Sequence, residues 1–300
     1  MYVLMGANGN ITSKAARLLL AQGQPVRVIG RRPENLRPLQ DAGAQIAVGD
    51  AADAGFLAQA FAGAAAVYAM IPPNYASPDP RADQTRIGEA IARAIAAAGV
   101  TRVVNLSSGG AHLPAGTGPI AGLHEQEQRL NRLSGVDLLH LRPGYFFENH
   151  LHAAGLIQAL GLYPAMERGD APIPMIATQD IAAVVARELQ KTGDGTGQRV
   201  LHLCATPFYT MQDAARILGA AIGKPGLQYV QADPAQVKAG MVQHGFSART
   251  ADLFEEMAAA LSGGAIAAAF TTGPTERTPT TLEDFAPVFA AHYRALQGTA

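Results

Sequence analysis

The sequence predicts an α/β fold in which a doubly wound parallel sheet is followed by a smaller C-terminal α/β region. Short apolar runs alternate with helical patterns over about the first 145 residues. Parallel neighbours in a sheet need crossover connections, and this strict alternation supplies them. With 300 residues, of which 48% are hydrophobic, the chain can also bury a substantial core.

Six apolar runs are short enough to be buried strands, and they cover residues 2–5, 26–30, 45–50, 66–71, 102–108 and 138–142. The fourth run stops at Pro72-Pro73, which cannot continue a hydrogen-bonded ladder. Apolar side chains at helical spacing predict helices at residues 11–19, 56–61, 78–98 and 123–133. These elements predict a first domain at residues 1–144.

After Pro143 the alternation becomes irregular, which predicts a smaller, mainly helical region at residues 145–300. A Pro-rich loop extends to Pro174, and residues 199–204 are a candidate seventh strand of the main sheet. Helices are expected at residues 150–160, 179–191, 211–222, 234–242, 249–261 and 282–296. The Ala/Gly-rich stretch 261–270 is expected to be the tail of a helix and a loop.

The composition of the chain indicates which kind of molecule it binds. The net charge is −1, from 23 basic and 24 acidic residues, which gives no electrostatic footprint for nucleic acid or an anionic membrane. The single cysteine, Cys204, excludes an internal disulfide framework. No uninterrupted apolar stretch of about 18 residues and no leader-like segment is found. We therefore expect a cytoplasmic protein that acts on a small molecule, with a homodimer or a protein partner if its role is regulatory.

The glycine-rich turn after the first strand is the strongest functional signal. Gly6 allows a tight turn out of the strand, and Gly9 allows the backbone to approach a phosphate closely. The helix that follows offers free N–H groups and a positive dipole end, so that a pyrophosphate fits there. Thr12 stands where the usual fingerprint has a third glycine. An ordinary βα turn is the alternative, but its position at the start of an alternating chain favours a dinucleotide.

The second strand ends in Arg31-Arg32, with no acidic residue at that point. An acidic side chain here would bond the ribose 2′-hydroxyl of NAD, whereas arginine accommodates the 2′-phosphate of NADP. Solvated loop charges are the alternative interpretation. The pattern favours NADP(H) over NAD(H).

A family resemblance rests on these motifs and four others: Asp50 after the third strand, Pro72-Pro73, and the segments 105–108 and 141–149. Together they resemble the NmrA-like branch of the atypical short-chain dehydrogenase/reductases. That branch includes NADPH-dependent quinone, azo-dye and triphenylmethane-dye reductases, plant aromatic ether reductases, and regulators that bind the dinucleotide without turning it over. The resemblance implies a Rossmann-type NAD(P)-binding domain and a C-terminal substrate region.

The resemblance also implies contacts for individual residues. Arg31 would bind the adenosine 2′-phosphate and Asp50 would border the adenine. The pyrophosphate would lie against Asn8, Gly9, Asn10 and Ile11. The nicotinamide ribose would be flanked by Met70, Ile71, Pro72, Asn105 and Ser107, with Pro73 on the substrate side.

One departure from the wider family affects the chemistry. Short-chain reductases commonly carry a Tyr-x-x-x-Lys pair about a dozen residues after the strand-five serine, and the corresponding positions here are Ile120 and His124. Isoleucine cannot donate a proton. His124 is therefore the candidate acid or ribose ligand, with a structural histidine as the alternative. Glu127, one helical turn further on, is expected to be a surface charge rather than a partner of the imidazole.

Aromatic residues follow the sixth strand at the mouth of the expected cleft. Tyr145, Phe146 and Phe147 are candidates for an apolar floor beneath a flat substrate, and core packing is the alternative for each ring. The nearby His150 and His152 suggest a metal site, but neighbours at i and i+2 on a helix point apart and no carboxylate lies at ligand spacing. No metal is expected.

These observations predict a reductase that transfers hydride from NADPH to a quinonoid or aromatic acceptor. The cofactor supplies the chemistry, so that the missing tyrosine does not prevent such a reduction. It does argue against alcohol–ketone interconversion, in which an alkoxide needs a proton donor. The main alternative is a non-catalytic regulator that senses NAD(P)H, and epimerase-like chemistry on a sugar nucleotide is disfavoured by the missing pair.

Overall fold

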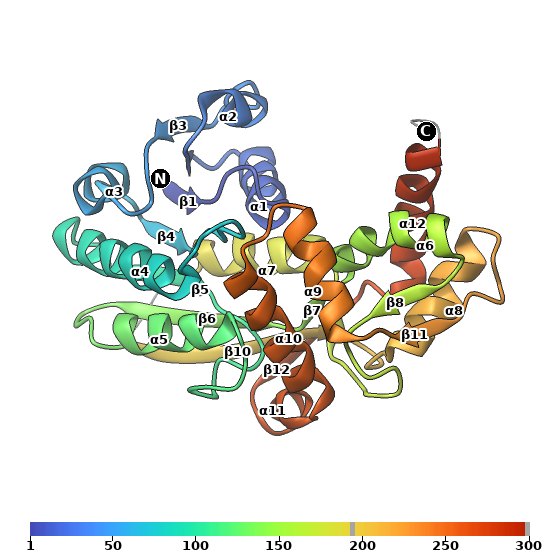
Figure 1. Cartoon of the computed structure of the whole chain (residues 1–300). Coiled ribbons are helices and arrows are strands. Elements are labelled where there is room, and N and C mark those ends of the chain that lie inside the picture. Colours follow the sequence, from blue (N-terminus) through green and yellow to red (C-terminus); the bar gives the residue numbers. More distant parts are fainter. Residues whose placement is uncertain (193–195, 298–300) are drawn as a thin grey trace.

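The computed structural model describes residues 1–192 and 196–297, and its centre is an eight-stranded, all-parallel sheet (Figure 1). The strand order is β12-β10-β6-β5-β4-β1-β2-β3. In chain order these strands are β1 (Tyr2–Met5), β2 (Val26–Gly30), β3 (Gln45–Val48), β4 (Ala66–Ala69), β5 (Arg102–Leu106), β6 (Asp137–Pro143), β10 (Gly197–Ala205) and β12 (Thr275–Thr278). The predicted doubly wound α/β fold is confirmed.

Helices cover both faces of the sheet, because successive side chains of each strand point to opposite faces. In β1, Val3 and Met5 pack on one side and Leu4 on the other. The first side is covered by α3 (Ala54–Phe61), α4 (Pro80–Ala97) and α5 (Ile120–Leu130), which lie together in Figure 1. The second side is covered by α1 (Asn10–Ala21), α2 (Pro33–Gln40) and α7 (Thr178–Gln190).

A smaller lobe extends from the β6–β10 side of the sheet and has its own apolar core. Phe147 and Phe289 are fully buried in that core. The lobe contains two small parallel pairs, β7 (Tyr145–Phe146) with β9 (Met175–Ile176), and β8 (Tyr163–Ala165) with β11 (Tyr229–Gln231). Its helical elements are the 3-10 helix η1 (Phe147–Ala153), α6 (Ala154–Leu160), α8 (Met211–Ala221) and α12 (Leu282–Gln297).

Three helices connect the lobe back to the sheet. These are α9 (Pro234–Gln243), α10 (Ala248–Ser262) and α11 (Ala265–Thr272), and they lie between the lobe and the α4–α5 side in Figure 1. The Ser247 N–H, at the start of α10, donates to the Tyr75 carbonyl at 2.9 Å. Tyr75 also stacks on Phe246, with ring centroids 4.9 Å apart. These contacts hold α10 over the loop that follows β4.

Two of the elements that differ from the sequence-based expectation are α11 and β12. The stretch 261–270 was expected to end in a loop, but α11 begins within it at Ala265. Gly263-Gly264 interrupts the helical pattern for only two residues, and Gly264 starts the new helix at φ +81°. The edge strand β12 was not predicted, since Thr275–Thr278 has no apolar run and pairs with β10 alone. The candidate strand at residues 199–204 lies within β10, which pairs with β6.

No single helix within residues 1–192 and 196–297 is long and apolar enough to cross a membrane. The pair α10 and α11, bent by 54°, meets that criterion only when the two helices are taken together, by length and composition.

Candidate active site

The glycine-rich turn leads from β1 into α1 as the sequence predicts. Gly6 has φ +75°, which a side chain would disfavour, and its carbonyl accepts the Gly9 N–H at 2.8 Å. The Thr12 hydroxyl donates to the Met5 carbonyl at 2.8 Å in the buried space between helix and strand. This bond provides the close helix–strand contact for which the usual fingerprint has a third glycine.

The start of α1 is open to an anion. Its N-cap is Gly9, so that no side chain caps the first N–H groups, and the first turn has no acidic residue. Asn8, Gly9 and Asn10 are exposed, whereas Ile11 is buried against the sheet. A Cβ on Gly9 would lie 3.1 Å from the Gly6 carbonyl oxygen, and the missing side chain leaves the backbone accessible. The residues present therefore fit a pyrophosphate.

The ends of β2 and β3 present charged side chains at the same edge of the sheet. Arg31 and Arg32 follow β2 and are exposed, and no carboxylate within residues 1–192 and 196–297 pairs with either guanidinium. Asp50 follows β3 and is exposed, and its Oδ1 accepts the Ala52 N–H at 2.9 Å. Arg31 is thus free to bind a 2′-phosphate, and Asp50 forms the tight turn that would border the adenine.

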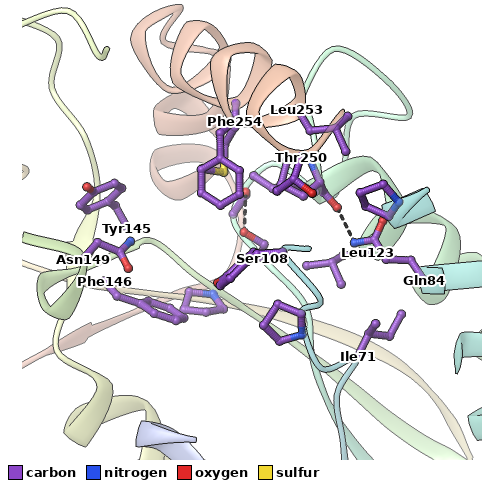
Figure 2. Close-up of a pocket in the computed structure, with 18 of the residues that line it drawn as sticks. Ile71, Gln84, Ser108, Leu123, Tyr145, Phe146, Asn149, Thr250, Leu253 and Phe254 are labelled. Atoms are coloured by element: carbon purple, nitrogen blue, oxygen red, sulfur yellow. Dashed lines mark hydrogen bonds between the residues drawn. The ribbon is translucent and has the colours of Figure 1, made fainter. Parts of the chain in front are cut away.

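A cavity of about 330 Å³ opens at the carboxyl edge of the sheet, beneath α10 (Figure 2). The loop after β4 contributes Ile71, Pro72, Pro73 and Tyr75, and the end of β5 is followed by Ser108 and Gly109. Ile120 and Leu123 come from α5, and α10 contributes Leu253, Phe254 and Met257. The lining is mostly apolar, as is typical of small-molecule sites in open α/β sheets.

The cavity lies next to the glycine-rich turn. A Cβ on Gly6 would meet the Met70 sulfur at 2.9 Å, and Ile71, the next residue, lines the cavity. A second connection runs through Glu148, whose carboxylate accepts the N–H and the hydroxyl proton of Thr178 at the start of α7. The Lys14 ammonium of α1 lies 3.5 Å from the same carboxylate and 2.8 Å from the Thr178 hydroxyl. This link between α1 and the 145–149 segment has no local signal in the sequence, because its residues are more than 100 positions apart.

The three aromatic residues after β6 do not share one role. Tyr145 and Phe146 line the cavity, and Figure 2 shows them on the wall opposite α5. Phe147 does not: it is fully buried in the lobe core, with its ring centroid 5.9 Å from that of Tyr209 and 5.7 Å from that of Phe285. Expecting Phe147 in the substrate pocket was wrong, because η1 begins at this residue and turns its side chain inward. Asn149, which sequence reasoning missed, lines the cavity instead.

The two polar residues near the end of β5 are less accessible than expected. The Asn105 amide lies 3.0 Å from His140 Nδ1, and His140 Nε2 lies 2.9 Å from Asn131 Oδ1. A neutral His140 protonated at Nε2 satisfies both bonds, and burial lowers its pKa to about 4. The Asn105 amide nitrogen is therefore engaged by His140. Ser107 is buried with no hydrogen-bond partner for its hydroxyl among the described residues, and the adjacent Ser108 lines the cavity.

His124 and Glu127 are engaged in structural contacts. His124 Nδ1 lies 2.9 Å from the Ala111 carbonyl, and His124 is not among the residues that line the cavity, although its neighbour Leu123 is. The expectation that Glu127 is a surface charge was wrong: its side chain is 2% exposed and forms a two-pronged ion pair with Arg142, at 2.9 and 2.5 Å. The partner comes from β6, and the helix alone did not reveal it. Both carboxylate oxygens are used, so that Glu127 does not orient the imidazole.

His150 is a buried lobe residue. Its Nδ1 bonds the Tyr163 hydroxyl, and burial lowers its pKa to about 3. His152 is on the same 3-10 helix. Within the described parts of the chain, no group of three or more His, Cys, Asp or Glu side chains is arranged to hold a metal ion.

Comparisons with known proteins agree with this geometry. A family model described as NAD(P)H-binding matches residues 6–192. The chain is 30% identical over 225 residues to a (4-alkanoyl-5-oxo-2,5-dihydrofuran-3-yl)methyl phosphate reductase of Streptomyces griseus, covering 75% of each chain. It is 28% identical over 297 residues to an NAD(P)H azoreductase of Xenophilus azovorans, covering 98% of this chain and 100% of that protein.

Two solved structures share the fold. An NADPH-dependent quinone oxidoreductase of Escherichia coli, complexed with NADPH, superimposes with a TM-score of 0.75 at 22% identity, covering 99% of this chain and 100% of the other. A triphenylmethane reductase of Citrobacter sp., complexed with NADP(H), gives a TM-score of 0.75 at 20% identity, covering 97% of this chain and 100% of the other.

Proposed function

This chain belongs to the NAD(P)H-binding family, within its NmrA-like reductase branch, and we propose that it is an NADPH-dependent reductase of a quinonoid or other flat aromatic acceptor. The observation that carries the proposal is the apolar cavity at the carboxyl edge of the sheet, next to the glycine-rich turn. A flat aromatic molecule would gain from burial there, and its position beside the turn would bring it to the nicotinamide end of a bound dinucleotide.

Several residues would hold the cofactor. The uncapped start of α1 would bind the pyrophosphate, Arg31 the 2′-phosphate, and the turn at Asp50 would border the adenine. The free guanidinium of Arg31 and the absence of an acid at the end of β2 support a preference for NADPH over NADH. When bound, the nicotinamide supplies a hydride to the acceptor.

The cavity walls would orient the acceptor and exclude water. Phe146 and Phe254 offer ring faces or edges to a flat molecule, and the Asn149 amide can donate a hydrogen bond to an acceptor carbonyl oxygen. Figure 2 shows Phe254 projecting from α10 toward the cavity. Side chains that hold the acceptor against the nicotinamide supply proximity and orientation. These are most of what hydride transfer requires of the protein.

Ile120 decides which reductions fit. It occupies the tyrosine-like position, it lines the cavity, and it has no proton to give. A ketone needs a proton donor as the alkoxide forms, whereas the anion of a reduced quinone is stable enough to form without one and to take its proton after release into water. The wall therefore favours a quinonoid acceptor over a simple ketone.

The glycine-rich turn and the missing proton donor at Ile120 also support a second candidate function. In it, the protein senses NADPH without turning it over. In that case the cavity would accommodate no acceptor productively. The distinction is experimental: we expect purified protein to oxidise NADPH when 1,4-naphthoquinone is added, with saturation in both substrates and a higher kcat/KM than with NADH. Tight NADPH binding without oxidation by any of a panel of quinones and dyes would favour the sensor.

A further inference from the structure

The lining of the cavity bears on the charge of the acceptor, if the protein is the reductase proposed above. Among the described residues that line the cavity, none is lysine, arginine or histidine, and the one carboxylic acid is Asp83. The other polar lining groups are amides and hydroxyls, from Asn74, Gln84, Ser108 and Asn149 among others. A negatively charged ligand would therefore find no cation on these walls.

The guanidinium groups closest in sequence to Asp83 each pair with a carboxylate, and Nη1 of Arg81 is buried without a hydrogen-bond partner among the described residues. Arg86 pairs with Asp83 at 3.1 Å, and its side chain is 56% exposed, so that it points to solvent. Arg81 pairs with Glu125 on α5. Asp83 also accepts from the Asn74 amide at 3.1 Å, and its hydrogen bond to Ser77, reinforced by Arg86, lowers its pKa. Asp83 is thus ionised at neutral pH, and together with Arg86 it forms an ion pair that leaves neither group free for an anion.

The physical consequence follows from desolvation. An uncharged ring gains free energy when it leaves water for the apolar wall formed by Phe146, Leu253, Phe254 and Met257. A sulfonate, carboxylate or phosphate on the same ring loses its hydration shell, and no buried cation replaces that shell. These walls therefore favour a neutral ring over the same ring with an anionic group.

We propose that this cavity selects its acceptor by charge, and that the substrates are uncharged flat molecules, whereas acceptors with an anionic group on the reacting ring system are rejected. The residues responsible are the apolar side chains of α10, which supply no cation, and Asp83 of α4, whose carboxylate pairs with the neighbouring Arg86 guanidinium.

A matched pair of acceptors tests the proposal, 1,2-naphthoquinone and 1,2-naphthoquinone-4-sulfonate. The sulfonate withdraws electrons, so that the anionic quinone is intrinsically the easier one to reduce, and a preference for the neutral one must come from binding. After subtraction of the direct reaction with NADPH, we expect kcat/KM for the sulfonate to be on the order of a hundredfold lower, about 2.7 kcal/mol. Calorimetric titration of each quinone into the protein with NADP+ should show the same order of affinities.

A variant with an added cation tests whether the lack of a cation causes the selection. Met257 lines the cavity with a long, flexible side chain, so that Met257→Lys places an ammonium there with little change in length, and Met257→Gln is the uncharged control. We expect Met257→Lys to raise the sulfonate-to-neutral ratio of kcat/KM about tenfold, and Met257→Gln to leave that ratio within twofold of wild type. Thermal unfolding checks that both variants are folded.

The possible outcomes distinguish a failure of charge selection from a failure of the proposed reductase activity. Equal use and equal binding of both quinones by the wild-type protein would overturn charge selection while leaving the reductase intact, as would the same gain from Met257→Gln. If neither quinone oxidises NADPH nor binds, the proposed function is wrong, and charge selection is overturned with it.

Discussion

The two glycines of the first turn have different structural duties, which predicts opposite effects for the same substitution. Gly6 has φ +75°, in the left-handed region, and a Cβ there would lie 2.9 Å from the flexible end of Met70. Met70 can move, so that the backbone conformation dominates and Gly6→Ala should cost about 1–2 kcal/mol of stability. Gly9 has φ −77°, which any residue adopts. In Gly9→Ala the new Cβ would lie 3.1 Å from the Gly6 carbonyl oxygen, which is a tight contact. The substitution also restricts the unfolded chain, which favours the folded state. Because the two effects offset each other, the free energy of unfolding should change by less than about 0.5 kcal/mol.

Cofactor binding should show the reverse order. The new Cβ in Gly9→Ala occupies the space through which the backbone would approach the pyrophosphate, and we expect the Kd for NADPH to rise tenfold or more, about 1.4 kcal/mol. Stability is measured by denaturant unfolding without cofactor, and affinity by calorimetric titration with NADPH. A Gly9→Ala variant that binds NADPH within twofold of wild type would refute the placement of the pyrophosphate at this turn. A Gly6→Ala variant of unchanged stability would refute the backbone argument.

Four further predictions concern single side chains. Arg31→Ala should reduce the preference for NADPH over NADH about tenfold in Kd, since it removes a charge-assisted contact to the 2′-phosphate, and an unchanged ratio would contradict that contact. His124→Ala should keep kcat/KM for quinone reduction within about twofold, because the ring bonds Ala111 and does not line the cavity; a hundredfold loss would restore a catalytic role. Glu127→Ala should lower the free energy of unfolding by about 3–5 kcal/mol, because it leaves the Arg142 guanidinium buried without its partner, and denaturant titration showing less than about 1 kcal/mol would disprove this. The folded-state pKa of His140, about 4, lies below its unfolded value near 6.5, so that the unfolded chain binds more protons between these pH values; stability should be full above pH 6.5 and fall by roughly 3 kcal/mol as the pH drops to 4, and His140→Asn should weaken that dependence in thermal melts.

The sequence predicted the sheet well because its signals are local. The turn at Gly6 and the proline pair after β4 mark strand ends within a few residues of themselves, and buried parallel strands appear as short apolar runs. The edge strand β12 lacks such a run, since Thr275–Thr278 pairs with β10 on one side only. An edge strand is partly exposed to solvent, so that its residues can be polar. Such a strand has no apolar run or alternation by which the sequence would reveal it.

The candidate site was predicted in part. The residues that were predicted differ in a physical way from those that were not. Residues that follow strand ends, such as Tyr145 and Phe146, could be placed from topology alone, because the carboxyl ends of parallel strands meet at one edge. Phe254 reaches the same cavity from α10, more than 100 residues later, and only tertiary packing brings it there. For the same reason Glu127 resembled a surface charge until Arg142, on a different element, was seen beside it.

A single-turnover experiment in a stopped-flow instrument tests whether the protein transfers a hydride from its bound NADPH to a quinone. Protein saturated with NADPH is mixed with 1,2-naphthoquinone, and the nicotinamide absorbance at about 340 nm is followed, together with a sample prepared with NADPH deuterated at the transferred position. We predict one full turnover per site, at a rate that saturates with quinone concentration and falls severalfold with deuterium, as expected when hydride transfer limits the step. NADPH that stays reduced on the protein, under conditions in which its binding is proven, would contradict the reductase and identify a protein that only binds the cofactor.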